Sequence, residues 1–299
     1  MSEEKQYTIA CFGEVLWDLL PMGKVAGGAP MNLAFHANNL GVKAKMISAL
    51  GEDELGTELL QFLTSKQVET NLIQRSQHLP TSTVQVTLDE KGSASYEIVN
   101  PVAWDAIKLT SQQVRAVQAA DVLLFGSLAC RTERSRDTLF QLIKRAKKTI
   151  FDVNLRPPFY TQPLLEYLLE KAYIVKMNEE ELAIIANWYT SLEEDTQQMN
   201  FLIERFGIET LIVTKGKEGA YCLTDGKLYE QATFTVEVAD TVGAGDAFLA
   251  GFITKMLVQE EWQECLKFAC ATGAVVASKV GGTPTVTADM VSEFLKTNI

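Results

Sequence analysis

The sequence predicts an α/β fold with a mainly parallel central sheet and a small additional β-sheet. Short apolar runs alternate with segments of helical length through the middle of the chain, which is typical of repeated βαβ units. Residues 82–99 instead alternate apolar and polar side chains around a turn, so they predict a hairpin with one polar face. The 299 residues are 47% hydrophobic and 22% charged, as in ordinary globular proteins, and we expect one large core with an appendage.

The first part of the chain predicts two strands and a helix. Residues 7–12 form a continuous apolar run that ends at a glycine, as a buried strand would. The glycine pair 27–28 leads into a helix over 30–40, because proline suits the first helical turn and glycine follows the last. A second strand is predicted at 43–48, followed by an acidic loop at 51–56.

Two polar residues of this region are candidates for a site. Asp18 follows the first strand, and its carboxylate suits the binding of two hydroxyl groups at once; a loop carboxylate in water is the alternative. Asn32 lies in the predicted helix next to the glycine turn, so we expect it at the site. His36 has no titratable partner at a useful spacing, and we expect it to be structural.

Four further strands are predicted, and polar or small residues follow each of them. The strands are 121–125, 149–151, 172–177 and 210–213, with helices near 133–147, 162–171, 179–190 and 195–206. The residues that follow them are Gly126-Ser127, Asp152-Val-Asn154-Leu-Arg156, Asn178-Glu-Glu-Glu181 and Thr214-Lys215-Gly216. Because open α/β sheets bind ligands at the carboxyl ends of their strands, these residues predict a site at that edge.

A fifth such end contains the most informative stretch, Asp240-Thr-Val-Gly-Ala-Gly-Asp246. A β-rich segment at 234–238 precedes it, and an apolar helix begins at about Gly245. Such a turn leaves backbone N–H groups free at a helix N-terminus, where an anion is favoured. Asp246 suits the role of a base that accepts an alcohol proton, and a simple helix-start carboxylate is the alternative.

Composition excludes several classes of function. The net charge of −11 argues against a general nucleic-acid or anionic-membrane surface. Five cysteines in apolar contexts, with only two histidines, show no zinc-ligand spacing and favour free thiols in the cytoplasm. No apolar run is long enough to cross a bilayer, the acidic start is unlike a signal peptide, and no P-loop or complete dinucleotide fingerprint occurs.

Three motifs together resemble the signatures of the ribokinase-like (PfkB) carbohydrate kinases. Asp240–Phe248 resembles their C-terminal signature, 27–32 through 51–56 is similar to their N-terminal signature, and Asn178-Glu-Glu-Glu181 matches their Asn-x-x-Glu element. The motifs occur in family order, and the resemblance covers residues 7–284. It implies a single domain over 1–299, folded as a three-layer α/β/α sandwich with a β-sheet lid formed by about 14–30 and 80–105.

The same resemblance implies transfer of the γ-phosphoryl group of ATP to a sugar hydroxyl. It makes Asp246 the catalytic base and the backbone of Gly243, Ala244 and Gly245 the anion hole. Asp18, Gly28 and Asn32 fall on sugar-contacting positions. Arg156 either reaches substrate or phosphate oxygens or pairs with a neighbouring carboxylate.

The remaining matched positions belong to the nucleotide and its metal. The nucleotide-binding positions are Asn178, Thr214, Lys215, Gly216 and Gly219. Glu181 falls on a position that organises Mg²⁺, through water, because Mg²⁺ keeps several of its own waters. Asp240 and the loop 278–285 fall where some members bind a monovalent cation such as K⁺.

The motif forms look most like those of fructokinases and imply the conversion of fructose to fructose 6-phosphate. A kinase for ribose or for a sugar acid such as 2-keto-3-deoxygluconate is the alternative in the same class. A non-catalytic sugar-binding regulator on the same fold is the alternative from another class. The alternating hairpin must cover something, which a lid over the site or a homodimer surface would supply.

Overall fold

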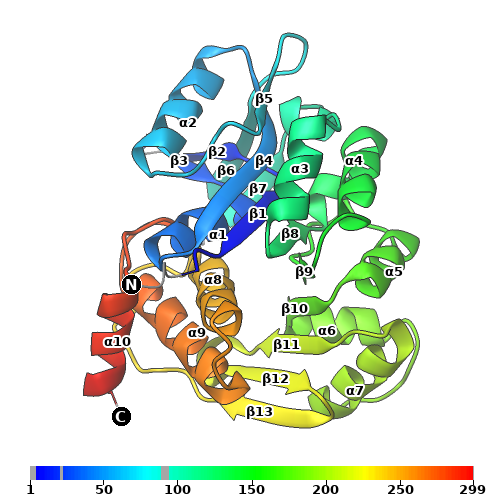
Figure 1. Ribbon diagram of the computed structural model, residues 1–299, viewed down its shortest axis with the longest axis vertical. Helices are drawn as coiled ribbons and strands as arrows, with labels where there is room; N and C mark the ends of the chain where they lie inside the picture. The colour runs from blue at the N-terminus through cyan, green and yellow to red at the C-terminus, as the bar shows by residue number, and fades with distance from the viewer. Residues whose placement is uncertain (1–4, 21–22, 89–93, 299) are drawn as a thin grey trace.

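Within residues 5–20, 23–88 and 94–298, which the computed structural model describes, thirteen strands form two sheets (Figure 1). For residues 86–88 and 94–97 this description covers the backbone alone. The large sheet has the order β13 (Lys227–Gln231), β12 (Ala220–Thr224), β11 (Thr210–Thr214), β10 (Ile174–Asn178), β9 (Thr149–Asp152), β8 (Val122–Gly126), β1 (Thr8–Phe12), β4 (Lys43–Gly51), β5 (Ile73–Ser76). The small sheet has the order β3 (Gly23–Gly27), β2 (Leu16–Leu20), β6 (Ser82–Leu88), β7 (Ala94–Ile98).

Helices cover the large sheet on both faces. One layer contains α1 (Ala29–Asn39), α8 (Ala244–Leu257), α9 (Trp262–Ala277) and α10 (Ala288–Thr297). The other contains α3 (Ser111–Ala119), α4 (Glu133–Ile143), α5 (Gln162–Lys171), α6 (Glu179–Ala186) and α7 (Asp195–Phe206), while α2 (Glu54–Ser65) packs against β2 and β4. In the described part of the chain, none of these helices combines the length and the apolar character needed to cross a membrane.

The strands of the large sheet are buried from both sides, as their continuous apolar runs predict. In β1, Ile9 and Cys11 face the core beneath α1, α8 and α9, whereas Ala10 and Phe12 face the core beneath the other helices. Successive side chains of a strand point to opposite faces, so one strand serves two cores. The three-layer α/β arrangement predicted from the sequence is therefore present.

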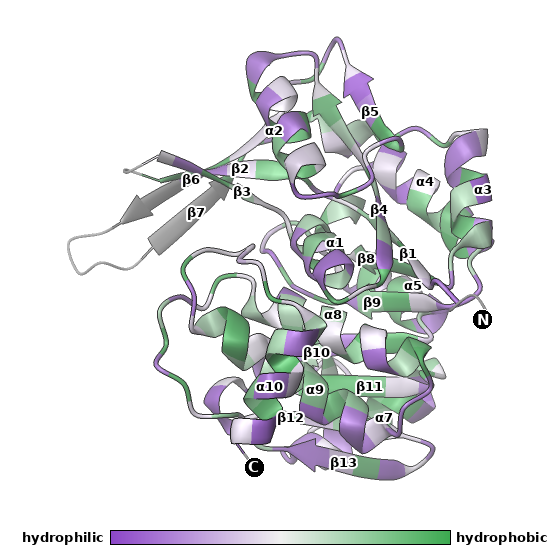
Figure 2. Cartoon of the chain, turned by 60° about the vertical axis from the view of Figure 1, so that its left-hand side comes forward, coloured by the Kyte–Doolittle hydropathy of each residue, from purple (hydrophilic) through white to green (hydrophobic). Residues whose placement is uncertain are grey.

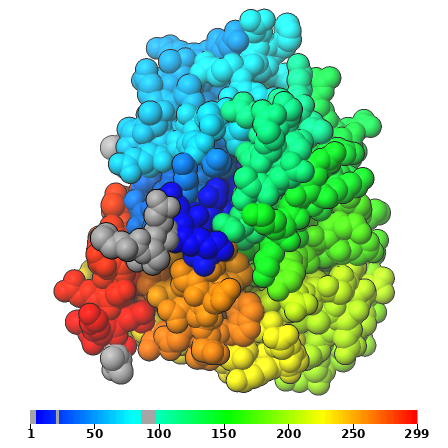
Figure 3. Space-filling model, viewed as in Figure 1, coloured from blue at the N-terminus to red at the C-terminus, as the bar shows by residue number. Residues whose placement is uncertain are grey.

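The first and last parts of the sequence lie side by side. Helix α1 packs directly against α8, and α8 against α9. On the face drawn in Figure 3, the orange C-terminal helices adjoin the blue N-terminal segment. This pairing brings the glycine turn before α1 close to the glycine turn before α8.

The small sheet projects from the body of the molecule (Figure 2). The hairpin predicted at 82–99 forms β6 and β7, which pair antiparallel, while its predicted turn at 89–92 lies outside the described residues. Strand β2 adds to β6 in parallel and to β3 in antiparallel orientation. The two segments expected to build the lid thus do form one separate sheet.

Two local predictions were wrong, and two edge strands were missed. Residues 234–238 form no strand, because the chain has left the sheet there: Ala239 N–H donates to the carbonyl of Ala277 at the end of α9. The antiparallel edge strands β12 and β13 were not predicted. The acidic loop at 51–56 is instead a helix start, in which the Asp53 carboxylate accepts from Gly56 N–H and caps α2.

Candidate active site

A pocket of about 620 Å³ lies between the large sheet and the small sheet. The small sheet contributes Leu16, Asp18, Val84 and Ile98 to its lining. The carboxyl ends of β9 and β10 and the start of α8 contribute most of the charged groups, namely Asp152, Arg156, Lys176 and Asp246. Four predicted site residues with polar side chains, Asp18, Asn32, Arg156 and Asp246, therefore meet in one cavity.

Asp246 lies in the first turn of α8, at the pocket wall. Its Oδ2 accepts a hydrogen bond of 2.8 Å from Asn32 Nδ2 on α1. Burial raises the pKa of Asp246 to about 7, and the nearby carboxylates of Asp152 and Glu14 add to the rise. The Asn32 hydrogen bond and the Lys176 ammonium act in the opposite direction. A carboxyl group with a pKa near neutrality is well matched to accepting a proton at physiological pH.

The turn before α8 exposes backbone donors. Gly243 has a φ of 75°, in the left-handed region, and a Cβ there would collide with the backbone of Gly282. Among the described residues, the N–H groups of Gly243 and Gly245 donate to no carbonyl, whereas that of Ala244 donates to Thr241 O at 3.3 Å. Free N–H groups at a helix N-terminus attract an anion.

A second loop, 278–285, holds this turn in place. His36 Nε2 donates to the carbonyl of Gly282 at 2.9 Å, so the proton of the ring lies on that nitrogen. The Asp240 carboxylate accepts from Val242 N–H and from Gly281 N–H, each at 3.0 Å. His36 therefore has the structural role expected of it, because it holds Gly282, whose backbone packs against Gly243.

Glycines make room for the predicted sugar-contacting residues. Gly28 has a φ of 114°, and a Cβ there would meet the carbonyl of Glu14. A Cβ on Gly27 would collide with the Asp18 carboxylate. Burial raises the pKa of Asp18, against the opposing effect of Arg156.

Arg156 does not use its side chain for an ion pair. Its Nη1 donates to the carbonyl of Leu155 at 2.9 Å, and the described residues place no carboxylate within ion-pair distance of it. Most of its donors are thus left for other partners, because a guanidinium carries five N–H groups. Of the two alternatives considered for Arg156, pairing with a neighbouring carboxylate is not observed.

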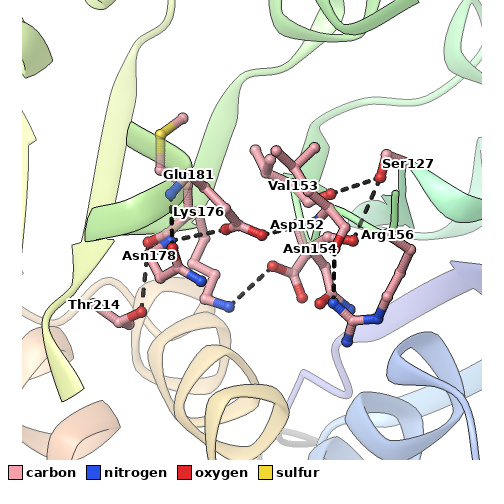
Figure 4. Close-up of polar contacts among 11 residues, drawn as sticks. Ser127, Asp152, Val153, Asn154, Arg156, Lys176, Asn178, Glu181 and Thr214 are labelled. Atoms are coloured by element: carbon pink, nitrogen blue, oxygen red, sulfur yellow. Dashed lines mark hydrogen bonds and ion pairs between the residues drawn. The ribbon is translucent and has the colours of Figure 1, made fainter. Parts of the chain in front are cut away.

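Two charged residues of the pocket were missed in the sequence. Lys176 Nζ lies 3.0 Å from Asp152 Oδ1, and both side chains are almost fully buried (Figure 4). Glu14 also lines the pocket, and its Oε2 has no hydrogen-bond partner among the described residues. The sequence did contain a signal for the buried pair, because a lysine inside an otherwise apolar parallel strand needs a partner of opposite charge.

Asn178 and Glu181 form a capping box at the start of α6. Asn178 Oδ1 accepts from Glu181 N–H at 2.8 Å, and Glu181 Oε2 accepts from Asn178 N–H at 2.9 Å. The other oxygen, Glu181 Oε1, accepts from Leu155 N–H at 2.7 Å (Figure 4). Glu181 therefore connects the ends of β9 and β10, beside the pocket rather than in its lining.

The remaining predicted nucleotide-binding residues follow the next strand. Thr214 pairs in register with Asn178, so the two lie on adjacent strand ends. Gly219 has a φ of 112°, and a Cβ there would overlap the backbone of Gln231. The Lys215 ammonium instead contacts Asp195 at 2.7 Å and Glu218 at 3.7 Å, and the hydrogen bond to Asp195 raises its pKa. Gly216, with a φ of 51°, begins the short helix η3 (Gly216–Glu218).

Several known proteins are similar to this chain in sequence and in fold. The model of the pfkB family of carbohydrate kinases matches residues 5–289. A fructokinase of Salmonella typhimurium is 31% identical over 259 residues, which cover 82% of each chain. A structure of a fructokinase from Xylella fastidiosa with bound ATP superposes with a TM-score of 0.84 at 26% identity, covering 97% of this chain and 98% of that one. A sugar kinase from Pyrococcus horikoshii in complex with ATP gives a TM-score of 0.84 at 27% identity, with 96% and 99% coverage.

Proposed function

Because this chain belongs to the pfkB family of carbohydrate kinases, we propose that it transfers the γ-phosphoryl group of ATP to fructose, forming fructose 6-phosphate. The whole chain would act as a single kinase domain, with the small sheet as a lid over the sugar. The names of the relatives and the ATP bound by two structural neighbours support this assignment.

The observation that carries the proposal is the placement of Asp246. Asp246 has a pKa near 7 and accepts a hydrogen bond from Asn32. It also lies at a helix N-terminus whose free N–H groups face the same pocket. In the reaction, Asp246 accepts the proton of the sugar hydroxyl while the oxygen forms a bond to phosphorus. The bond from phosphorus to the leaving ADP oxygen breaks, and the backbone donors of the turn 243–245 stabilise the charge.

The charges of the pocket favour a neutral sugar over a sugar acid. Four carboxyl groups, from Glu14, Asp18, Asp152 and Asp246, line it with only two cationic side chains. A substrate that carries its own carboxylate would meet this excess of negative groups, whereas hydroxyl groups donate hydrogen bonds to carboxylates. Asp18 and Asn32 would bind the hydroxyls of the sugar, with Arg156 on the phosphoryl side.

ATP would bring Mg²⁺, which prefers oxygen ligands and keeps several waters. Both oxygens of Glu181 already accept backbone N–H groups, so Glu181 would contact the metal through a bridging water. Asn178, Thr214, Gly216 and Gly219 would surround the nucleotide. Lys215 fits less well through its side chain, because that ammonium is already paired. A monovalent cation such as K⁺ would have to use carbonyl oxygens near Asp240, whose carboxylate is occupied by two N–H groups.

A sugar panel tests the proposal. Fructose, ribose, glucose and 2-keto-3-deoxygluconate are each supplied with ATP and Mg²⁺, and ADP release is followed in a coupled assay. We expect kcat/KM for fructose to exceed that for every other sugar by at least about tenfold, which is 1.4 kcal/mol of transition-state discrimination. A higher value for ribose or the sugar acid would reject fructose, and sugar binding without any ADP release would indicate a regulator.

A further inference from the structure

The ion pair between Lys176 and Asp152 has no evident structural purpose. Lys176 is 8% exposed and Asp152 is 4% exposed, so both charges have been removed from water. Its neighbours in β10 are the apolar residues Ile174, Val175 and Met177, all fully buried. Burying an ion pair costs desolvation energy, and an apolar pair of similar volume serves stability at least as well. The charges therefore call for an explanation beyond packing.

The Lys176 ammonium lies at the first turn of α8. Its Nζ is 3.6 Å from the position that a Cβ on Gly245 would occupy. Besides Asp152, the charged groups that act on it are Glu181, in the first turn of α6, and Asp246, in the first turn of α8. Lys176 is thus the ammonium in the pocket lining that adjoins both the base and the backbone donors.

The hydrogen-bonding capacity of this ammonium is only partly used. Lysine carries three N–H donors, and within the described residues Lys176 makes one hydrogen bond, to Asp152 Oδ1. Burial alone lowers the pKa of Lys176, but the carboxylates of Asp152 and Glu181 outweigh it, and the pKa rises. The group consequently remains a cation with two free donors at the edge of the pocket.

We propose that Lys176 is a catalytic residue whose ammonium contacts the γ-phosphoryl group during its transfer and rests on Asp152 when no phosphoryl group is present. This inference rests on the kinase reaction proposed above. The sugar oxygen loses its proton to Asp246, gains the bond to phosphorus and displaces ADP, while Lys176 stays protonated throughout. Asp152 acts as a positioning residue, because it holds the ammonium in place between turnovers.

Three variants test the assignment by steady-state kinetics. Lys176→Met should lower kcat by about 10²–10³-fold, the usual effect of removing one donor to a developing charge, and leave KM for fructose within threefold. Lys176→Arg keeps a cation and should recover at least tenfold of that loss. Arg131→Met is the matched control: it breaks a second buried ion pair, of 2.7 Å to Asp105, outside the pocket lining. It should lower thermal stability without a comparable loss of kcat.

The pH profile of kcat separates a catalytic pair from a structural one. Lys176 lowers the pKa of Asp246 and Asp152 raises it, so the two charges have opposite effects on the base. Lys176→Met should move the acid limb of the profile to higher pH, and Asp152→Asn should move it to lower pH. A loss of packing alone would not shift the limb in opposite directions, and an unchanged limb in both variants would overturn the proposal.

Nucleotide binding tests the role of Lys176 independently of the sugar. By calorimetry, Lys176→Met should weaken binding of the non-hydrolysable ATP analogue AMPPNP at least tenfold, and that of ADP less than twofold, because ADP lacks the γ-phosphoryl group. Equal losses for both nucleotides, or none, would reject the contact. If the unmodified protein phosphorylates no sugar of the panel, the kinase reaction fails, while the difference between AMPPNP and ADP still decides the role of Lys176.

Discussion

The two sides of the pocket differ in what they contribute. The edge of the large sheet and the start of α8 bring Asp152, Lys176 and Asp246, whose hydrogen bonds and ion pairs fix them to neighbouring elements. Among the side chains that the structure describes, the small sheet brings three apolar ones and one carboxylate, Asp18. Within these residues, one wall carries fixed charges, and the other is mainly an apolar surface with one polar group.

We propose that this difference separates catalysis from substrate recognition. Groups that act on a developing charge must be held rigidly, which packed helices and central strands achieve better than a projecting sheet. We expect substitutions in the large-sheet wall to lower kcat, and those in the small-sheet wall to raise KM. Substitutions on each wall test this division directly.

Asp246→Asn should have the largest effect. The amide keeps the shape of the side chain but accepts no proton, so kcat should fall by at least about 10³-fold, within the range for loss of a general base. Fructose binding by calorimetry should persist. Asp137→Asn, on the exposed surface of α4, is the control with the same chemical change. Turnover within tenfold of the unmodified protein would remove Asp246 from the mechanism.

The pH profile should report the same residue. The base works when deprotonated, so kcat/KM should rise tenfold per pH unit below about 7 and level off above it. The Asn32 hydrogen bond lowers the pKa of Asp246, so Asn32→Ala should move this limb to higher pH. A limb near pH 4, the range of an ordinary aspartate, would contradict the assignment.

Asp18→Ala tests the opposite wall. Losing a carboxylate that accepts from sugar hydroxyls should raise KM for fructose by about 10-fold to 100-fold, the effect of one charged hydrogen bond. Turnover at saturation should stay within about threefold, because binding that is equal in ground and transition states affects KM alone. A fall in kcat as large as that of Asp246→Asn would break the division between the walls.

His36 should make stability depend on pH. Burial lowers its pKa from 6.5 to about 4, so the folded state disfavours the protonated ring. The contribution is complete above pH 6.5 and declines as pH falls towards 4. Between pH 7.5 and 5.5, the free energy of unfolding should fall by about 1.4 kcal/mol more than in His36→Gln, whose amide still donates to Gly282 O. Urea unfolding of both proteins at the two pH values measures the difference. An equal fall in the free energy of unfolding in both proteins would refute the prediction.

Asp53→Ala should have the smallest effect, at the joint between the walls. Asp53 caps α2 and also accepts from Thr81 N–H at 2.7 Å and Thr81 Oγ1 at 2.6 Å, just before β6. Its loss should cost about 1–2 kcal/mol of unfolding free energy and raise KM for fructose a few-fold. An unchanged KM would show that this joint does not position the small sheet.

The glycine-rich patterns predicted the two turns that line the pocket, because the backbone angles that a turn requires are a local property. Gly28 and Gly243 need backbone angles that other residues rarely adopt, and each immediately precedes a helix. Asp246 follows one of these turns, so pattern and position coincide. The alternation of apolar residues likewise predicted the central strands and the β6–β7 hairpin.

The missed features depend on contacts between distant residues. Lys176 interrupts an apolar strand by a single residue, and its partner Asp152 comes from a different strand. Lys215 follows a strand end as predicted, yet Asp195 at the start of α7 determines where its ammonium lies. The segment 234–238 has strand-like composition, but the chain has left the sheet at that point.

The hydrogen bond between Asn32 and Asp246 joins residues that are 214 positions apart. All described strands are complete by Gln231, whereas α8 begins at Ala244. During synthesis the ribosome therefore releases every described strand of the two sheets before it releases the proposed base. A nascent or prematurely terminated chain that ends before Asp246 contains Asp18, Asn32 and the two residues of the buried ion pair, but it lacks the proposed base. Under the proposed mechanism, such a chain would therefore transfer no phosphoryl group.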